Sequence, residues 1–480
     1  MTDRPNVLLI TTDQQRFDTI NAAGNPHIRT PNLNWLADNG VRFSNAYTDC
    51  PICVPARATI MMGKHGHTIG LVSNGGKRVI DAERSLPGIL TRAGYQTRAQ
   101  GKMHFHPRRC NHGFEHMEIL EDYYRYMAAH PEKGVPMDHG LGQNVMEPGV
   151  STVDETNSLT HWTVGRSVDF LETRDDSRPF FLWTSFAKPH PPLDPCRSYW
   201  EMYRDRPVPA PIRGDWSSSL EDIPPGFLVS SFYLNMCHRF DETLMTDVRR
   251  AYYACITQVD YNLGILFSRL REMDMLENTW IIFTADHGEM LGDHQMGAKS
   301  VGLEGAAHVP MLIKPPGGHG AIDDPRRGLV SDTLVCLADV LPTIAAITGV
   351  EAPDGLDGTD MLAAAEGGKR REVLHGECKD YFYVREGDYK YCYESLGGGE
   401  LMFNLREDPR EEHDLVRAGE EQETRERLRG VLVERLASAG KDAVNDGDLV
   451  CRNPHLTLDD LPRNTWPGYH TRKVAVDVLH

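Results

Sequence analysis

The sequence of 480 residues contains no long apolar run. Its longest purely apolar stretches, such as residues 7–10, are far shorter than the roughly 20 residues that a membrane-spanning helix needs. The opening segment MTDRPNVLLI also lacks the apolar core and the small-residue cleavage site of a secretory signal. We therefore expect a cytoplasmic protein with no membrane partner.

Positive charge is scarce as well, because 51 Lys and Arg stand against 69 Asp and Glu, for a net charge of -18. This balance gives no basic surface for a phosphate backbone, so we expect no nucleic acid partner. The ten cysteines show no disulfide-framework spacing, which is typical of thiols in a reducing compartment. Only Cys50 and Cys53 lie close together, and the chain contains no internal repeat.

Buried strands are predicted where runs rich in Val, Ile, Phe and Thr precede polar residues. These runs are NVLLITT before Asp13, YQTRAQ before Gly101, PFFLWTSF before Ala187 and TWIIFTA before Asp286. Between them, DVRRAYYACITQVDYNLGILFSRLREM carries apolar residues at the spacing of one helix face. Alternating strands and helices favour a layered α/β fold, and the length permits one large domain and a smaller one.

The C-terminal part changes in character. A charged, Gly-rich stretch at 355–371 predicts a boundary, which separates a catalytic domain, 1–365, from a subdomain, 366–480. Within the latter, DYFYVREGDYKYCYE predicts a hairpin with a Glu-Gly-Asp turn, and 420–438 predicts a surface helix. The last forty or so residues show no period, and we expect an extended tail that contacts a second copy in a homo-oligomer.

Polar side chains that suit catalysis follow the predicted strands, where ligands bind in open α/β sheets. They are Asp13 and Gln14, Lys102 and His104 in GKMHFHP, Lys188 and His190 in AKPHPP, and Asp286 and His287 in TADHGE. Asp13, Gln14, Asp286 and His287 offer hard oxygen ligands and one nitrogen to a divalent cation. A lone Asp after a strand is usually a turn residue, but four such residues on two strand ends favour a metal site.

The stretch DCPICVPARATIMMGKH contains the close cysteine pair. Pro55 suits the first turn of a helix, so Cys53 is expected near a helix N-terminus, which lowers the pKa of a thiol. Three interpretations stay open: a redox pair, half of a zinc site and the precursor of a nucleophile. The zinc-site interpretation has the least support, because no second Cys/His pair lies at the spacing usual for zinc ligands. Cys50 is open to a purely structural role.

The segment CVPAR, residues 53–57, resembles the C-x-P-S/A-R signature of type I sulfatases of the alkaline phosphatase superfamily. The motifs around Asp13, GK-x-H, K-P-H, DHG and the later Lys299 follow in that family's order, as do the phrases TPNLNWLADNGVRFSNAY and MFNLREDPREEHDL. The likeness extends over about residues 4–417. It implies an alkaline-phosphatase-like large mixed sheet flanked by helices, with a smaller C-terminal subdomain of antiparallel sheet plus helix.

The resemblance implies hydrolysis of a small anionic sulfate ester, aryl, alkyl or sugar, to alcohol and sulfate. A maturation enzyme would convert Cys53 to formylglycine. The hydrated aldehyde would attack sulfur to give a covalent sulfoenzyme, from which sulfate is expelled as the aldehyde re-forms. Arg57 would stabilise the hydrate, and His104, for which His106 is the alternative, would accept its proton.

Roles for the remaining residues follow from the same resemblance. Lys102 and Lys299 would hold sulfate oxygens, and His190 would stabilise or protonate the leaving oxygen. Lys188 is expected to be a solvated or structural lysine, with a role beside Lys102 and Lys299 as the alternative. One divalent ion, Ca²⁺ with Mn²⁺ as the alternative, is implied at the four strand-end ligands.

Gln14 departs from the many sulfatases that have a second aspartate there. The Asp-Gln version also occurs in choline sulfatases and phosphonate monoester hydrolases. A phosphonate monoester or phosphodiester hydrolase is therefore the alternative function, and a thiol oxidoreductase is a further one. Lys102 and His104 favour sulfate, because the phosphonate enzymes of the family typically have uncharged residues at these positions.

Further polar residues are expected to lie outside the catalytic machinery. We expect hydrogen-bonded or substrate-side histidines rather than metal ligands at positions 65, 67, 106 and 308, and a polar loop around Asp293 and His294. Substrate specificity is expected from loops 71–77 and 123–162.

Overall fold

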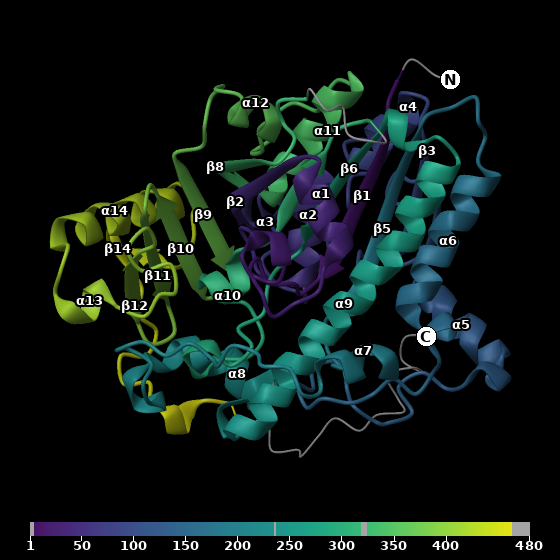
Figure 1. Cartoon of the computed structure of the whole chain (residues 1–480). Coiled ribbons are helices and arrows are strands. Elements are labelled where there is room, and N and C mark those ends of the chain that lie inside the picture. The colour runs from purple at the N-terminus through teal and green to yellow at the C-terminus, as the bar shows by residue number, and fades with distance from the viewer. Residues whose placement is uncertain (1–3, 235–236, 318–323, 463–480) are drawn as a thin grey trace.

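The computed structural model describes residues 4–234, 237–317 and 324–462, and its largest element is an eight-stranded mixed sheet (Figure 1). The strand order is β4-β3-β5-β1-β6-β7-β2-β8. The strands are β1 (Asn6–Asp13), β2 (Val41–Tyr47), β3 (Gln96–Gly101), β4 (His116–Ile119), β5 (Phe180–Pro189), β6 (Thr279–Ala285), β7 (Met311–Lys314) and β8 (Leu329–Cys336). The expected large mixed sheet is confirmed.

The register of the central strands decides where the polar strand ends lie. β1 pairs in parallel with β5 and β6, and β3 pairs in parallel with β5, so the carboxyl ends of these four strands share one edge. Asp13 at the end of β1 faces Pro189 of β5 across the ladder. These are the four strands that the apolar runs predict. The other four have shorter or partly exposed patterns, and β7 runs antiparallel to both neighbours.

Helices cover both faces of this sheet, and alternate residues of β1 divide between them. Val7 and Leu9 belong to the core under α2 (Cys53–Met62), α4 (Leu86–Arg92) and α11 (Val340–Thr348). Leu8 and Ile10 belong to the core under α1 (Pro31–Asp38), α6 (Leu159–Thr173) and α9 (Glu242–Glu272). All four side chains are fully buried, which stabilises the fold by about 1.5–3 kcal/mol for each.

The longest helix, α9, forms where the apolar spacing predicts it (Figure 1). Asp241 caps its first turn by accepting the N–H of Leu244. Arg269 and Arg271 lie in its last turn, where cations interact favourably with the helix dipole. Other, shorter helices are α3 (Gly66–Ile69), α5 (Leu120–Ala129), α7 (Arg197–Tyr203), α8 (Val229–Leu234), α10 (Glu304–Ala307), α12 (Met361–Ala365) and α13 (Leu415–Ala418).

A four-stranded antiparallel sheet follows in the C-terminal part, in the order β12-β11-β10-β9. Its strands are β9 (Val373–Cys378), β10 (Tyr381–Glu386), β11 (Tyr389–Glu394) and β12 (Glu400–Asn404). The predicted hairpin is β10–β11, which turns at Gly387 and Asp388. The predicted surface helix is α14 (Gln422–Ser438), whose buried leucines pack on this sheet. The smaller sheet-plus-helix unit is therefore confirmed.

The end of the described chain is less irregular than its sequence indicates, since β13 (Val444–Asn445) and β14 (Asp448–Leu449) form a short hairpin. The tail beyond residue 462, with the expected homo-oligomer contact, lies outside the described residues. The boundary between 365 and 366 stays a prediction. Within the described ranges, no helix combines the length and the apolar character that crossing a membrane requires.

Three histidines meet where α3 and its preceding loop pack near β9 and α14. Burial, the guanidinium of Arg435 and the imidazole of His65 together lower the pKa of both His67 and His375 to about 4. Both imidazoles are therefore neutral in the folded protein, whereas an exposed histidine gains a proton near pH 6.5. Because the unfolded chain binds more protons, the free energy of unfolding falls as pH drops from about 6.5 to 4.

We expect a lower urea midpoint at pH 5 than at pH 7 and a smaller difference between the two in His375→Gln. The glutamine keeps a polar side chain of similar length but cannot take up a proton. Urea unfolding of both proteins at the two pH values measures this. An unchanged pH dependence in the variant would show that His375 does not contribute.

Candidate functional site

The close cysteine pair leads into α2, as its sequence indicates. Cys53 is the first residue of the helix, and all ten helical residues are buried. The N–H of Val54 donates to Oδ1 of Asn74 at 3.0 Å, which satisfies one of the free donors of the first turn. Cys53 Sγ lies 3.2 Å from Nε2 of His287 and 3.8 Å from Oδ1 of Asp13. The helix start thus places Cys53 against the strand ends.

Cys50 and Cys53 have different partners, and both are free thiols. Burial raises the pKa of Cys50, and a hydrogen bond with Cys378 raises it further. Burial alone would also raise the pKa of Cys53, but the nearby cations Lys299 and Lys102 bring it well below its usual value. The two cysteines are therefore not paired as in a CxxC redox site, and only Cys53 has the environment of a reactive group.

Arg57 lies one helical turn after Cys53 and is fully buried. Its Nε donates to Oδ2 of Asp286 at 2.9 Å, and its Nη2 lies 3.2 Å from Oδ2 of Asp13. Nη1 donates to Oγ of Ser185 at 2.8 Å. A planar guanidinium supplies donors in a fixed fork, so Arg57 holds both carboxylates in place. Ser185 lies on β5, beside β1, and nothing in the sequence predicts its contact with Arg57.

Asp13, Asp286 and His287 form with Cys53 a buried group whose ligand atoms all lie within 4.8 Å of one another. Burial and the neighbouring Asp13 carboxylate raise the pKa of Asp286 to about 6, whereas the nearby cations outweigh burial at Asp13 and lower its pKa. Nδ1 of His287 donates to the carbonyl of Gly288 at 2.9 Å, which leaves Nε2 as the ligand atom. This donor set can hold a divalent metal ion.

Gln14 stands beside this group with a left-handed backbone, φ 68°. Its amide nitrogen donates to Glu289, and its amide oxygen accepts from Lys299. The carboxylate of Glu289 is buried and also accepts the backbone N–H groups of Leu291 and Ala298. Glu289 therefore fixes the orientation of the Gln14 amide. Glu289 is not among the predicted site residues, although it follows DHG directly and lies only two residues beyond His287.

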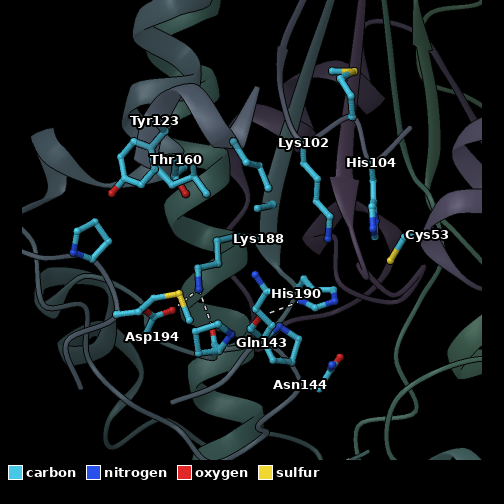
Figure 2. Close-up of a pocket in the computed structure, with 18 of the residues that line it drawn as sticks. Cys53, Lys102, His104, Tyr123, Gln143, Asn144, Thr160, Lys188, His190 and Asp194 are labelled. Atoms are coloured by element: carbon cyan, nitrogen blue, oxygen red, sulfur yellow. Dashed lines mark hydrogen bonds and ion pairs between the residues drawn. The ribbon is translucent and has the colours of Figure 1, made fainter. Parts of the chain in front are cut away.

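A cavity of about 470 Å³ opens in front of these residues (Figure 2). Five of the predicted site residues line it: Cys53, Lys102, His104, His190 and Lys299. Asp13, Gln14, Arg57, Asp286 and His287 lie behind this lining. Residues of both expected specificity loops, among them Asn74, Tyr123 and Thr160, form other parts of the wall. The strand ends, the helix start and the loop that carries Lys299 thus bring all ten predicted residues to one place.

Positive charge surrounds the cavity side of Cys53. Nζ of Lys102 lies 2.6 Å from Oδ2 of Asp13, and Nζ of Lys299 lies 3.1 Å from Nε2 of His190. Burial, Lys102 and Lys299 lower the pKa of His190 to about 4, so this imidazole is neutral. Its Nδ1 donates to the carbonyl of Pro191, and Nε2 therefore accepts from Lys299. Such a site attracts a small anion despite the acidic surface.

The two candidate histidines of GKMHFHP separate clearly. His104, with φ 59°, lines the cavity and hydrogen-bonds Cys53, which lowers the pKa of the thiol. His106 is exposed and forms a β-bridge with Val79. His308 stacks on Phe17 and hydrogen-bonds Glu304, as expected for a structural histidine.

The expected polar loop around Asp293 and His294 is present, but its charged side chains are not solvated. Both side chains are buried, and Asp293 forms ion pairs with Arg16 and Arg249. Burial lowers the pKa of His294 to about 4. The segment is therefore a buried, charged loop between Asp286 and Lys299.

Comparisons with known proteins place these features in context. The family model described as Sulfatase matches residues 5–350. An arylsulfatase of Clostridium perfringens (strain 13 / Type A) is 32% identical over 490 residues, which cover 95% of this chain and 100% of that protein. A choline-sulfatase of Rhizobium meliloti (strain 1021) is 32% identical over 450 residues, which cover 86% and 83%. The solved phosphonate monoester hydrolase of Silicibacter pomeroyi has a TM-score of 0.75 at 20% identity, covering 94% of this chain and 100% of that chain. The structural likeness concerns the fold, whereas the sequence matches extend over most of the chain.

Proposed function

Because this chain belongs to the sulfatase family and is a sulfuric ester hydrolase of the alkaline phosphatase superfamily, we propose that Cys53, converted to formylglycine by a maturation enzyme, supplies its nucleophile. The observation that carries this proposal is that Cys53 faces a cavity lined by Lys102, His104, His190 and Lys299. An aldehyde hydrate at this position would have a base, His104, within hydrogen-bonding reach and cations on the side where an anionic ester must enter.

The lining residues then have distinct tasks. Lys102 and Lys299 hold the sulfate oxygens and balance their charge. His104 takes the proton that the side chain of residue 53 must lose. Nε2 of His190 shares a hydrogen with Lys299, so this pair delivers a proton to the leaving oxygen. Arg57 forms ion pairs with Asp13 and Asp286 and thereby holds the two carboxylates in position beside the nucleophile.

Asp13, Gln14, Asp286 and His287 are proposed to hold one divalent ion, Ca²⁺, with Mn²⁺ as the alternative. When bound, the ion supplies Lewis acidity toward the sulfate oxygens. The burial of both carboxylates beside the imidazole of His287 supports this, because their ligand atoms lie within 4.8 Å of one another.

We expect Asp286→Asn to weaken metal binding by at least about 10-fold, since changes even in groups around metal ligands have effects of this size. Metal content after dialysis against a series of Ca²⁺ or Mn²⁺ concentrations measures this for folded protein. Asp332→Asn is the matched control, because Asp332 is exposed and forms a surface ion pair with Arg370. Equal metal content in the two variants would contradict the ligand assignment.

The proposed substrate class is an aryl sulfate, supported by the apolar and aromatic part of the cavity wall, which includes Phe105, Tyr123 and Tyr124. Comparing kcat/KM for an aryl sulfate and an aryl phosphonate with the same leaving group tests the assignment. We expect the sulfate to be preferred by at least about 10-fold, because Lys102 and His104 are matched to its charge. A large preference for the phosphonate would favour the alternative function.

Two further proposals concern the whole chain. All ten cysteines are free thiols, which supports a cytoplasmic location. A division into units 1–365 and 366–480 is supported by the two separate sheets, β1–β8 and β9–β12.

A further inference from the structure

Lys188 and Asp194 form an ion pair in the wall of the catalytic cavity (Figure 2). In this view they lie on the side away from Cys53, with His190 between. Lys188 is the penultimate residue of β5, and its side chain is only 16% exposed. The pair belongs to no part of the proposed sulfate chemistry, since Lys102 and Lys299 already surround the cavity side of Cys53. Its position is that of a group that contacts the alcohol part of the substrate.

Hydrogen-bonding capacity is left over on both partners. The ammonium of Lys188 donates to the carbonyl of Pro192 at 2.5 Å and to Oδ1 of Asp194, and the described residues supply no third acceptor. Oδ2 of Asp194 lies 3.0 Å from Nε2 of His139. Nδ1 of His139 accepts the N–H of Leu141, so Nε2 is the donor to Asp194. Each carboxylate oxygen keeps a second lone pair.

The pair therefore offers one donor and at least one acceptor side by side, with its charges cancelled. A carboxylate or an ammonium on the substrate would meet repulsion from one partner, whereas a hydroxyl both accepts and donates. The only other carboxylate among the described lining residues, Glu121, is itself paired with Arg108. No unpaired anion of the described wall is thus available to a cationic alcohol.

Resting on the proposed sulfatase function, we infer that Lys188 and Asp194 determine specificity by binding a second hydroxyl on the leaving alcohol. That hydroxyl accepts from Lys188 and donates to Asp194. The surrounding wall is apolar and aromatic, which suits a ring between the sulfated oxygen and the second hydroxyl. Its residues include Met103, Phe105, Leu120, Tyr123, Met137 and Leu159. The substrate class is a monosulfate of a dihydroxylated aromatic compound.

Matched pairs of aryl sulfates test this inference. Each pair, of one ring or of two, differs only in a distal hydroxyl or methyl group, as in 4-hydroxyphenyl and 4-methylphenyl sulfate. We expect kcat/KM of the wild-type enzyme to be at least about 10-fold higher for the hydroxyl member of one pair, because buried polar groups are left unpaired by the methyl member. A third aryl sulfate with a carboxylate at the same distal position should have a lower kcat/KM than the hydroxyl compound.

The variant Lys188→Met/Asp194→Asn removes both charges together, which avoids leaving one buried charge unpaired. We expect its hydroxyl-to-methyl ratio of kcat/KM to fall to within about 2-fold of unity. Lys441→Met is the control, because it breaks an ion pair with Glu377 away from the cavity, and its ratio should equal that of the wild type.

Equal kcat/KM for the hydroxyl and methyl members in the wild type would overturn the inference without any variant. A preference for the carboxylate member, or a ratio that survives in the double variant, would overturn it too. Hydrolysis of the methyl members tests the sulfatase function separately. If the wild type hydrolyses no aryl sulfate, the proposed function fails, and this inference fails with it.

Discussion

Replacing Cys53 with alanine is expected to lower kcat/KM for an aryl sulfate by at least about 10³-fold, because loss of a nucleophile removes the covalent route altogether. Cys50→Ala should stay within about 3-fold of the wild type. Cys50 is buried against Cys378 and does not line the cavity, whereas Cys53 does. The comparison separates the nucleophile hypothesis from a redox pair, in which both cysteines are essential.

The mass of the peptide that contains Cys53 completes this test. Protein produced together with a formylglycine-generating enzyme and digested without alkylation should contain an aldehyde at position 53. A free thiol in spite of active maturation would contradict the proposed nucleophile. A disulfide between Cys50 and Cys53 would support the oxidoreductase alternative, and it would require both thiols to leave their present partners, Cys378 and His287.

The strand-end residues could be predicted because their positions depend on backbone topology alone. Asp13 and Asp286 follow β1 and β6, which are adjacent and parallel, so their side chains meet wherever the register brings the strand ends level. The position of Cys53 could be predicted for a similar reason, because Pro55 marks the first turn of the helix. Local sequence signals of this kind determine the backbone position from which a side chain projects.

Contacts that depend on the path of a loop could not be predicted. Lys188 follows an apolar strand and looks like a solvated residue, yet the following proline-rich segment brings Asp194 back to its ammonium. Asp293 lies in a polar sequence, but α9 supplies Arg249 and the end of β1 leads to Arg16, so its carboxylate is buried. The spacing of apolar residues does not predict such ion pairs. Some join segments that are far apart in the chain, and others form where the chain reverses direction within a few residues.

Among the variants proposed here, Lys390→Met is expected to lower the free energy of unfolding the most. Lys390, on β11, is fully buried and lies 2.7 Å from Oε1 of Glu304 and 2.6 Å from Oε1 of Glu411. Burial and the carboxylate of Glu304 raise the pKa of Glu411 to about 7, even though Lys390 opposes this shift. Removing the one cation that joins both carboxylates leaves buried negative charge uncompensated, which costs about 3–5 kcal/mol of unfolding free energy.

Urea unfolding at pH 8 measures this loss, with Lys441→Met as the control. Lys441 is partly exposed, and its partner Glu377 keeps a second cation, Arg435, at 2.8 Å, so the control should lose no more than about 1 kcal/mol. The defect of Lys390→Met should shrink between pH 8 and pH 5. Without Lys390 the pKa of Glu411 rises further, so the folded variant binds a proton that the unfolded chain releases, and its stability increases as pH falls. Equal losses in the two variants at pH 8 would show that Lys390 does not stabilise the packing of β11 against the segment that carries Glu304.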